Sequence, residues 1–374
     1  MELQNARIAF IALQAYPLFR AEAGLRMGGA EVQIHQLARI LIEQYGCRAR
    51  FICLAPRDGL ETHGPIEVAA ISRRHGALGK TRQIFRALEG FGADCVLQRS
   101  WGLETWIGAR YAARRGKRFV FMAASIPDIQ PPHPSDWLHW RRAAYRLGLR
   151  RAHAVVAQSE EQVAAFERHY ATRATLIRSF QPPPEPREED QGYVLWVGRA
   201  IEGKRAELLL DLAERFPRIP FVLILNPAQD KEYYDVLCAR AARLPNVRHV
   251  PYVPHTEIMP WFRGARLFVG TSVREGFPNT YLQAFRAWTP VLSLCVDPDH
   301  IIRKERLGFV GDDDFEALAR ELERRYGDAE WVHETGRRAA EHVRAFHDPD
   351  RLANEWGDLL GRLLAPLKKP PERV

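Results

Sequence analysis

Short apolar runs alternate along the chain with longer segments that have helical spacing. Residues 8–13 are apolar almost throughout, as is typical of a parallel strand buried on both faces. After them, apolar side chains recur at helical intervals between positions 32 and 41, and further runs at 50–54, 95–98 and 118–122 are expected to be strands. With helices between these strands, the pattern predicts a doubly wound α/β domain.

The alternation continues to the end of that domain and starts again after a change in composition. Residues 154–157 and 176–178 are expected to be strands, and Ser159 begins a capping box for the helix between them. Residues 181–190 are rich in proline and charge, which predicts a linker. A second α/β domain then opens with a strand at 193–197. We therefore expect domains at 1–180 and 192–350, joined by residues 181–191.

Composition narrows the class of protein and of partner. A chain of 374 residues with 46% hydrophobic and 27% charged residues suits two soluble domains. Residues 8–13 are too few for a membrane span or a signal-peptide core, and five scattered cysteines favour reduced thiols in a cytoplasm. The net charge of +8 predicts an anionic partner, either a nucleotide, a phospholipid surface or a nucleic acid. Nucleic acid is not expected, because no zinc finger or RNA-binding aromatic motif is present.

The second domain contains a loop suited to a ligand with both phosphate and hydroxyl groups. Glu275 to Asn279 follow an apolar strand and precede a helix that opens near Thr280, with Asn279 expected as its N-cap. Free amides and the positive end of a helix dipole would then lie beside a carboxylate at a strand end. The alternative is an ordinary strand-to-helix crossover with one exposed glutamate.

Two other loops carry candidate phosphate contacts. Arg199 and Lys204 follow the strand at 193–197, so a guanidinium fork and an ammonium can meet adjacent phosphate oxygens. Gly28 and Gly29 open the first long helix, where backbone can approach a phosphate closely. Solvated basic side chains and a tight turn are the structural alternatives. The aspartates at 312–314 precede a helix and are expected to cap it, without holding a metal.

These motifs together resemble one family. Glu275-Gly-Phe-Pro-Asn279, with a polar residue eight positions after the glutamate, is similar to the donor-site motif of retaining GT-B glycosyltransferases of glycosyltransferase family 4. Gly28-Gly-Ala-Glu31 resembles the N-terminal glycine loop of that family, and Arg199 with Lys204 its diphosphate clamp. The resemblance implies two Rossmann-like domains that face each other across a cleft. It also implies a C-terminal helix, within 351–374, that returns toward the first domain.

The resemblance assigns roles to individual residues. Glu275, Arg199 and Lys204 would be catalytic, with Glu275 orienting the sugar and the two cations stabilising the leaving diphosphate. The chain departs from the family at Gln283, where a glutamate is usual, so the ribose would be held by an amide without charge. The residues expected to bind the donor are Gly28, Gly29, Arg205, Asn226, Tyr252, Val253, Gly276, Phe277, Pro278, Asn279, Thr280 and Gln283.

The acceptor side is less well defined. Many members of the family have a histidine after the strand at 118–122, and this chain has none on the strand end. Ser125 and Asp128 are the nearby polar candidates, and each also fits a turn. Within residues 136–170, a mixture of arginine and aromatic residues resembles helices that lie on anionic membranes, and a solvated arginine face is the alternative.

By this resemblance, the chain transfers a sugar from a UDP- or GDP-sugar to a hydroxyl of a sugar or lipid-linked acceptor. Retention at the anomeric carbon, a role in cell-surface polysaccharide or glycolipid synthesis, and a cytoplasmic or peripheral inner-membrane location follow from it. No cofactor or metal is expected. A nucleotide-sugar-binding protein without catalysis and a GT-B epimerase are alternatives. A dehydrogenase is not favoured, because neither domain has Gly-x-Gly-x-x-Gly after its first strand.

Overall fold

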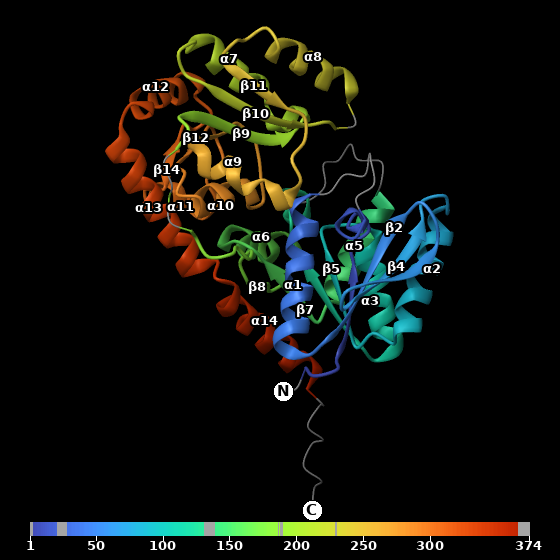
Figure 1. The fold of residues 1–374 in the computed structure, drawn as a ribbon. Helices are drawn as coiled ribbons and strands as arrows, with labels where there is room; N and C mark the ends of the chain where they lie inside the picture. The colour runs from blue at the N-terminus through green and yellow to red at the C-terminus, as the bar shows by residue number, and fades with distance from the viewer. Residues whose placement is uncertain are drawn as a thin grey trace, which may run out of the picture. The chain divides into compact units, whose positions relative to one another are not determined.

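The computed structural model describes residues 3–20, 28–130, 139–185, 187, 190–228 and 230–365. The chain divides into two compact units (Figure 1). The first unit contains Met1–Phe180 together with Asp350–Val374, and the second contains Gln181–Pro349. The second unit is therefore inserted, in chain order, before the last helix of the first.

The first unit has an eight-stranded sheet in the order β3-β4-β2-β1-β5-β6-β7-β8. Its strands are β1 (Arg7–Ile11), β2 (Arg48–Ala55), β3 (Gly59–His63), β4 (Ile66–Ser72), β5 (Cys95–Arg99), β6 (Arg118–Met122), β7 (Ala154–Ala157) and β8 (Thr175–Leu176). Its α-helices are α1 (Gly29–Tyr45), α2 (Ala77–Phe91), α3 (Leu103–Arg115), α4 (Ile126–Ile129), α5 (His139–Arg150), α6 (Glu160–Tyr170) and α14 (Pro349–Leu364), and η1 (Tyr16–Leu18) is a 3-10 turn.

The pairing of these strands confirms a doubly wound fold and adds one element that the pattern did not predict. Every pair is parallel except β3 with β4. We expected only helices between the strands at 50–54 and 95–98, and the structure places the β3–β4 hairpin there as well. Asp58-Gly59 and Gly64-Pro65 provide turn residues at its ends.

Both faces of this sheet are covered, because alternate side chains of each buried strand point to opposite sides. Ile8 and Phe10 of β1 belong to a core with α1 and α14, whereas Ala9 and Ile11 belong to a core with α2, α3 and α6. Trp356 of α14 is only 1% exposed in the first of these cores. The last helix is thus an integral part of the first unit.

Helices α1 and α14 approach each other closely at one glycine. The Tyr45 hydroxyl donates to the Ala353 carbonyl at 3.0 Å. A Cβ added at Gly357 would lie 2.3 Å from the Tyr45 hydroxyl oxygen. Only a residue without a side chain fits there while the tyrosine keeps its hydrogen bond.

The second unit has a six-stranded parallel sheet in the order β11-β10-β9-β12-β13-β14. Its strands are β9 (Tyr193–Arg199), β10 (Phe221–Asn226), β11 (Val247–Val250), β12 (Ala265–Gly270), β13 (Val291–Ser293) and β14 (Gly308–Val310). Its α-helices are α7 (Glu207–Arg215), α8 (Lys231–Ala241), α9 (Met259–Gly264), α10 (Asn279–Arg286), α11 (Ile301–Lys304), α12 (Phe315–Tyr326) and α13 (Ala329–Phe346), with 3-10 turns η2 (Glu202–Lys204), η3 (His255–Glu257) and η4 (Pro298–His300).

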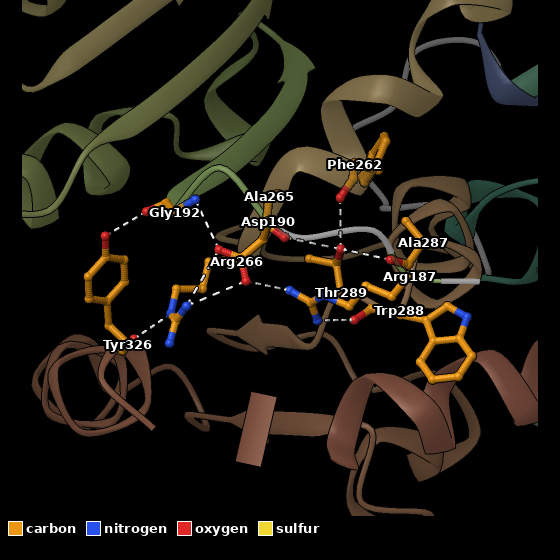
Figure 2. Close-up of polar contacts among 10 residues, drawn as sticks. All are labelled: Arg187, Asp190, Gly192, Phe262, Ala265, Arg266, Ala287, Trp288, Thr289 and Tyr326. Carbon is orange, nitrogen blue, oxygen red and sulfur yellow. Dashed lines mark hydrogen bonds and ion pairs between the residues drawn. The ribbon is translucent and has the colours of Figure 1, made fainter. Parts of the chain in front are cut away.

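The described part of the expected linker is attached to the second unit. The Arg187 guanidinium donates to the Trp288 carbonyl at 2.7 Å and pairs with Asp190 at 2.9 Å (Figure 2). Asp190 also accepts from the Gly192 amide at 3.0 Å, just before β9. Burial lowers the pKa of Arg187, and the charge of Asp190 opposes that shift. A composition typical of a linker therefore includes a half-buried ion pair that anchors the entry to the second unit.

Candidate functional site

The site candidates of the second unit lie where its sheet changes direction. Strand β9 is flanked by β10 on one side and by β12 on the other. Crossovers from the two sides therefore diverge at the carboxyl ends of β9 and β12, and open α/β sheets bind ligands at such a point. Lys204 follows β9 in the chain, and Glu275 follows β12.

Lys204 and Glu275 form a direct ion pair between Nζ and Oε1. Their side chains are 23% and 20% exposed, so both remain accessible to a ligand. A partly exposed pair of this kind contributes only about 0–1 kcal/mol to stability. Its contribution to folding is therefore small, and both side chains can exchange this contact for a ligand. The sequence identified both residues as catalytic candidates, and the structure brings them together.

Thr271 holds the two loops in register. Its hydroxyl donates to the Lys204 carbonyl at 2.6 Å and accepts from the Trp196 indole at 2.9 Å. Its own carbonyl accepts from Arg205 Nε at 2.8 Å. Arg205 has a φ of +48°, in the left-handed region. The backbone at Lys204 is thus held by Thr271, the residue after β12, which Trp196 of β9 holds in turn.

Arg205 links this region to the expected aspartate cap. Its Nη1 pairs with Asp313 at 2.7 Å, and its buried Nη2 has no partner among the described residues. Asp314 accepts from the Ala317 amide at 3.0 Å and is the N-cap of α12. The predicted helix cap is confirmed at Asp314, and Asp313 has the additional role of pairing with Arg205.

The helix after Glu275 begins one residue earlier than the cap prediction requires. Pro278 is the N-cap of α10, and Asn279 is its first helical residue, so the assignment of Asn279 as N-cap is wrong. Proline suits the entry because its fixed φ, here −67°, is compatible with extended backbone. Gly276 and Thr280 are half-buried in this segment, whereas Phe277 and Pro278 are buried.

Gln283 lies on α10 and is only 7% exposed. Its Nε2 lies 3.5 Å from Nε2 of His255, which the sequence analysis did not identify. Desolvation by burial lowers the pKa of His255, and the positive charge of Arg286 lowers it further. The neutral imidazole of His255 therefore faces the neutral amide of Gln283, at the position where the resemblance led us to expect a glutamate.

The other donor candidates occupy the same end of the sheet. Arg199 is the last residue of β9, is exposed, and pairs in register with Asn226 of β10. Asn226 is half-buried, and its Oδ1 has no partner among the described residues. Tyr252 is 60% exposed after β11, and Val253 packs partly against the core. Each is available for contact, with Tyr252 the most exposed.

Gly28 and Gly29 belong to the first unit and lie at the N-terminus of α1, as expected. Gly28 is the N-cap, and its amide donates to Glu31 Oε2 at 2.9 Å. The Gly28 amide, which the glycine loop would otherwise offer to a phosphate, thus already donates to Glu31.

The two acceptor candidates serve the turn that leads into α4. Asp128 has no exposed surface and accepts from the backbone amides of Trp101, Ala124 and Ser125 at 2.6, 2.7 and 2.6 Å. Burial raises the pKa of Asp128, and these amides oppose the shift. Ser125 is the N-cap of α4 and is half-buried. The geometry favours a structural role for Asp128, and direct contact with an acceptor is open only to Ser125.

The arginine and aromatic residues singled out within 136–170 lie mainly on α5, and residues 131–138 are outside the described part of the chain. Tyr145 is buried, whereas Trp140 is 55% exposed, with the Arg141 guanidinium 5.4 Å from its ring. No helix within the described residues is both long and apolar enough to cross a membrane.

Comparison with known proteins defines the class. Residues 28–180 match the glycosyl transferase 4-like domain, and residues 191–328 match the glycosyl transferases group 1 model. Together the two matches cover more than half of the chain, which therefore belongs to the GT-B glycosyltransferases of the group 1, family 4-like kind. Among curated proteins, none matches the sequence.

Solved structures support the fold. Sucrose-phosphate synthase from Thermosynechococcus elongatus is 19% identical, with a TM-score of 0.79 over 96% of this chain and 100% of the other. HepE of Anabaena, solved with UDP, is 16% identical with a TM-score of 0.72, covering 96% and 100%. The pneumococcal O-GlcNAc transferase GtfA, solved with UDP and GlcNAc, is 10% identical with a TM-score of 0.72, covering 97% and 100%. At these identities the likeness concerns the fold.

Proposed function

We propose that the protein transfers a sugar from a nucleoside diphosphate sugar to a hydroxyl acceptor, with retention at the anomeric carbon. The observation that carries this proposal is the Lys204–Glu275 pair at the switch point of the second unit, beside Arg205 and the N-terminus of α10. A diphosphate and a sugar hydroxyl together would satisfy the separated ammonium and carboxylate better than water does.

The roles follow from the charges. As the bond between the sugar and the diphosphate breaks, negative charge grows on the departing phosphate, and Lys204 and Arg199 stabilise it. The N-terminus of α10 adds the positive end of a helix dipole. Glu275 then accepts hydrogen bonds from the sugar and fixes its orientation. Gln283 holds the ribose with its amide.

The ligands of two structural relatives agree with such a donor. HepE was solved with UDP, and GtfA with UDP and GlcNAc. By analogy, UDP-sugars come first for testing here, followed by GDP-sugars. We further propose a hexosyl donor, a sugar or lipid-linked acceptor and a role in cell-surface polysaccharide or glycolipid synthesis in the cytoplasm, with no metal required.

Thermal unfolding in the presence of nucleotides tests the donor. A ligand that binds only the native state raises Tm, by an amount that grows with its concentration over Kd. UDP or GDP should raise Tm of the wild type, and Lys204→Ala should lose the rise. An unchanged Tm with UDP, GDP and ADP alike would contradict the proposal. The anomeric configuration of the product, read by NMR coupling constants, tests retention.

We also propose that the protein binds the surface of an anionic membrane through α5. Trp140 and Leu147 are exposed on the helix that also carries Arg141, Arg146 and Arg150. Arginine and tryptophan side chains suit the interface of an anionic bilayer. Cosedimentation with anionic vesicles should exceed that with neutral vesicles and should fall in Trp140→Ser. Equal recovery from both kinds of vesicle would remove this part.

A further inference from the structure

The first unit has a switch point of its own. Strand β1 is flanked by β2 and β5, just as β9 is flanked by β10 and β12 in the second unit. The loops after β1 and β5 therefore diverge at their carboxyl ends, where a ligand is expected. The corresponding place in the second unit holds Lys204 and Glu275. No candidate from the sequence belongs to β5 itself or to the loop that follows it in the chain.

Arg99 is the last residue of β5, and neighbouring strand ends fix its side chain. Its Nη2 donates to Gln158 Oε1 at 2.8 Å, and the same oxygen accepts from the Ser179 hydroxyl at 2.6 Å. The other end of the Gln158 amide donates to the Ala123 carbonyl at 2.8 Å. Gln158 thus connects the ends of β5, β6, β7 and β8 and holds the guanidinium in one orientation.

The rest of the Arg99 guanidinium is unsatisfied. Its Nε is shielded from solvent and has no hydrogen-bond partner among the described residues. Within the same residues, no carboxylate lies within ion-pairing distance of it. A shielded guanidinium nitrogen without a partner is costly, so such a group is expected to have one in the working protein. Burial lowers the pKa of Arg99 to about 10, which leaves it charged at neutral pH.

The nearest carboxylates are committed to other donors. Asp128 already accepts three backbone amides, and Glu31 caps the Gly28 amide at the first turn of α1. Both act on Arg99 only through their charge. The residue after Arg99, Ser100, has a φ of +70°, a conformation that non-glycine residues seldom adopt. A fixed, partly compensated guanidinium thus lies on an irregular loop at a ligand-binding edge.

We propose that Arg99 binds an anionic group, a phosphate or a carboxylate, carried by the acceptor substrate. The Nε hydrogen and the Nη hydrogens that Gln158 does not accept can bind such a group through two parallel hydrogen bonds, which orient as well as attract it. That the molecule bound here is an acceptor rests on the proposed function. That the bound group is anionic is argued only from the geometry of the first unit.

Inorganic phosphate is the probe for binding of an anion at Arg99. Tm is measured in phosphate and in chloride at equal ionic strength, and each variant is compared with its own value in chloride. The phosphate-specific rise should be present in the wild type, lost in Arg99→Gln and partly kept in Arg99→Lys. It should persist in Lys204→Ala, which removes a cation from the second unit.

Arg118→Gln is the matched control. Arg118 is also a half-buried arginine of the same sheet, but it begins β6 at the opposite edge and donates to the Leu363 carbonyl at 2.6 Å. It should keep the phosphate effect. An equal rise in wild type and Arg99→Gln, or none in the wild type, would overturn the proposal. Because the rise is measured within each variant, a loss of basal stability does not obscure it.

Transfer assays distinguish an acceptor anion from the diphosphate of the donor. The probes are a hexose phosphate, a hexuronic acid and the uncharged hexose. Loss of a charged hydrogen bond of about 1.5–3 kcal/mol raises KM for an anionic acceptor roughly 10- to 100-fold. Arg99→Gln should show that rise in KM only with an anionic acceptor, while the UDP-induced shift in Tm stays equal to that of the wild type.

A reduced UDP-induced shift in Tm of Arg99→Gln would place the donor diphosphate at Arg99 and overturn the acceptor assignment. Absence of any nucleotide effect in the wild type would instead contradict the proposed function and leave the phosphate result standing.

Discussion

Lys204 and Glu275 are 71 positions apart in the sequence and pair directly at the carboxyl edge of the second sheet. Each is the partner of the other when no ligand is bound. A donor that engages both must separate them, at a cost of about 0–1 kcal/mol for a partly exposed pair. The ion pair therefore keeps the two side chains in place without a large barrier to binding.

Removing either member should abolish transfer. We expect Lys204→Ala and Glu275→Ala to reduce kcat by about 10²–10³, the loss typical of one electrostatic group at a reacting centre. Circular dichroism and Tm should stay close to those of the wild type. Arg215→Ala, which breaks the exposed Arg215–Glu316 pair in the same unit, is the control and should retain activity. Near-normal turnover in both site variants would remove the assignment.

Changing Gln283 to the acid of the family should leave donor binding intact or tighten it. The new carboxylate can accept from ribose hydroxyls, and it would face His255, whose Nε2 is 3.5 Å from the Gln283 amide nitrogen. An adjacent negative charge favours protonated imidazole, so the pKa of His255 should rise from its lowered value. NMR titration of the imidazole measures the shift. Loss of nucleotide binding in Gln283→Glu would show that Gln283 has another role.

Glu61 of β3 should contribute to the free energy of unfolding at neutral pH, and this contribution should be lost in acid. Hydrogen bonds from His63 and Arg20 lower its pKa to about 2, from an ordinary value of 4.5. A carboxylate with a lowered folded-state pKa contributes stability that is present above the unfolded value and is lost as pH falls through the folded one. Glu61→Gln should therefore cost up to about 1 kcal/mol at pH 7, after allowance for solvent screening, and much less near pH 2–3. Urea titrations at both pH values measure it, and an equal cost at both would contradict the assignment.

The contact between Gly357 and Tyr45 should be sensitive to one methyl group. Gly357→Ala places a Cβ against the tyrosine hydroxyl and is expected to cost about 1–3 kcal/mol. Tyr45→Phe in the same chain removes the clashing oxygen and should restore part of the loss. Gly90→Ala, in the exposed part of α2 with its nearest neighbour 3.9 Å away, should instead be neutral or stabilising. Denaturant midpoints of the wild type and of these three variants measure the effect.

Metal removal should leave transfer unchanged. The positive charge expected at the diphosphate comes from Arg199, Lys204 and the α10 terminus. Activity after EDTA treatment and desalting should equal that of the untreated enzyme. A loss that Mg²⁺ or Mn²⁺ restores would assign the charge to an ion.

Local patterns were sufficient for the doubly wound architecture and for most strands. They failed at the β3–β4 hairpin, because a short apolar run such as 68–71 does not distinguish a strand from a buried helix by periodicity. The cap at Asn279 was misplaced by one residue because Pro278 also suits a helix entry. Such boundaries depend on the backbone path, which composition does not specify.

Motifs identified Lys204 and Glu275 as candidates on two separate loops, but did not predict that the two side chains pair. The pairing of Lys204 with Glu275, and of His255 with Gln283, depends on strand order, because each brings together distant loops. Arg99 had no motif around it. A polar residue that ends an apolar strand is a usable signal, and its significance appears once β5 is known to lie beside β1.

The last helix has a consequence for the order of assembly during synthesis. Trp356 and its apolar neighbours on α14 complete a core whose remaining members are made before residue 181, whereas Gln181–Pro349 form a contiguous unit. On the ribosome, the later-made unit can therefore finish folding first, while the earlier one waits with apolar surface uncovered until α14 emerges.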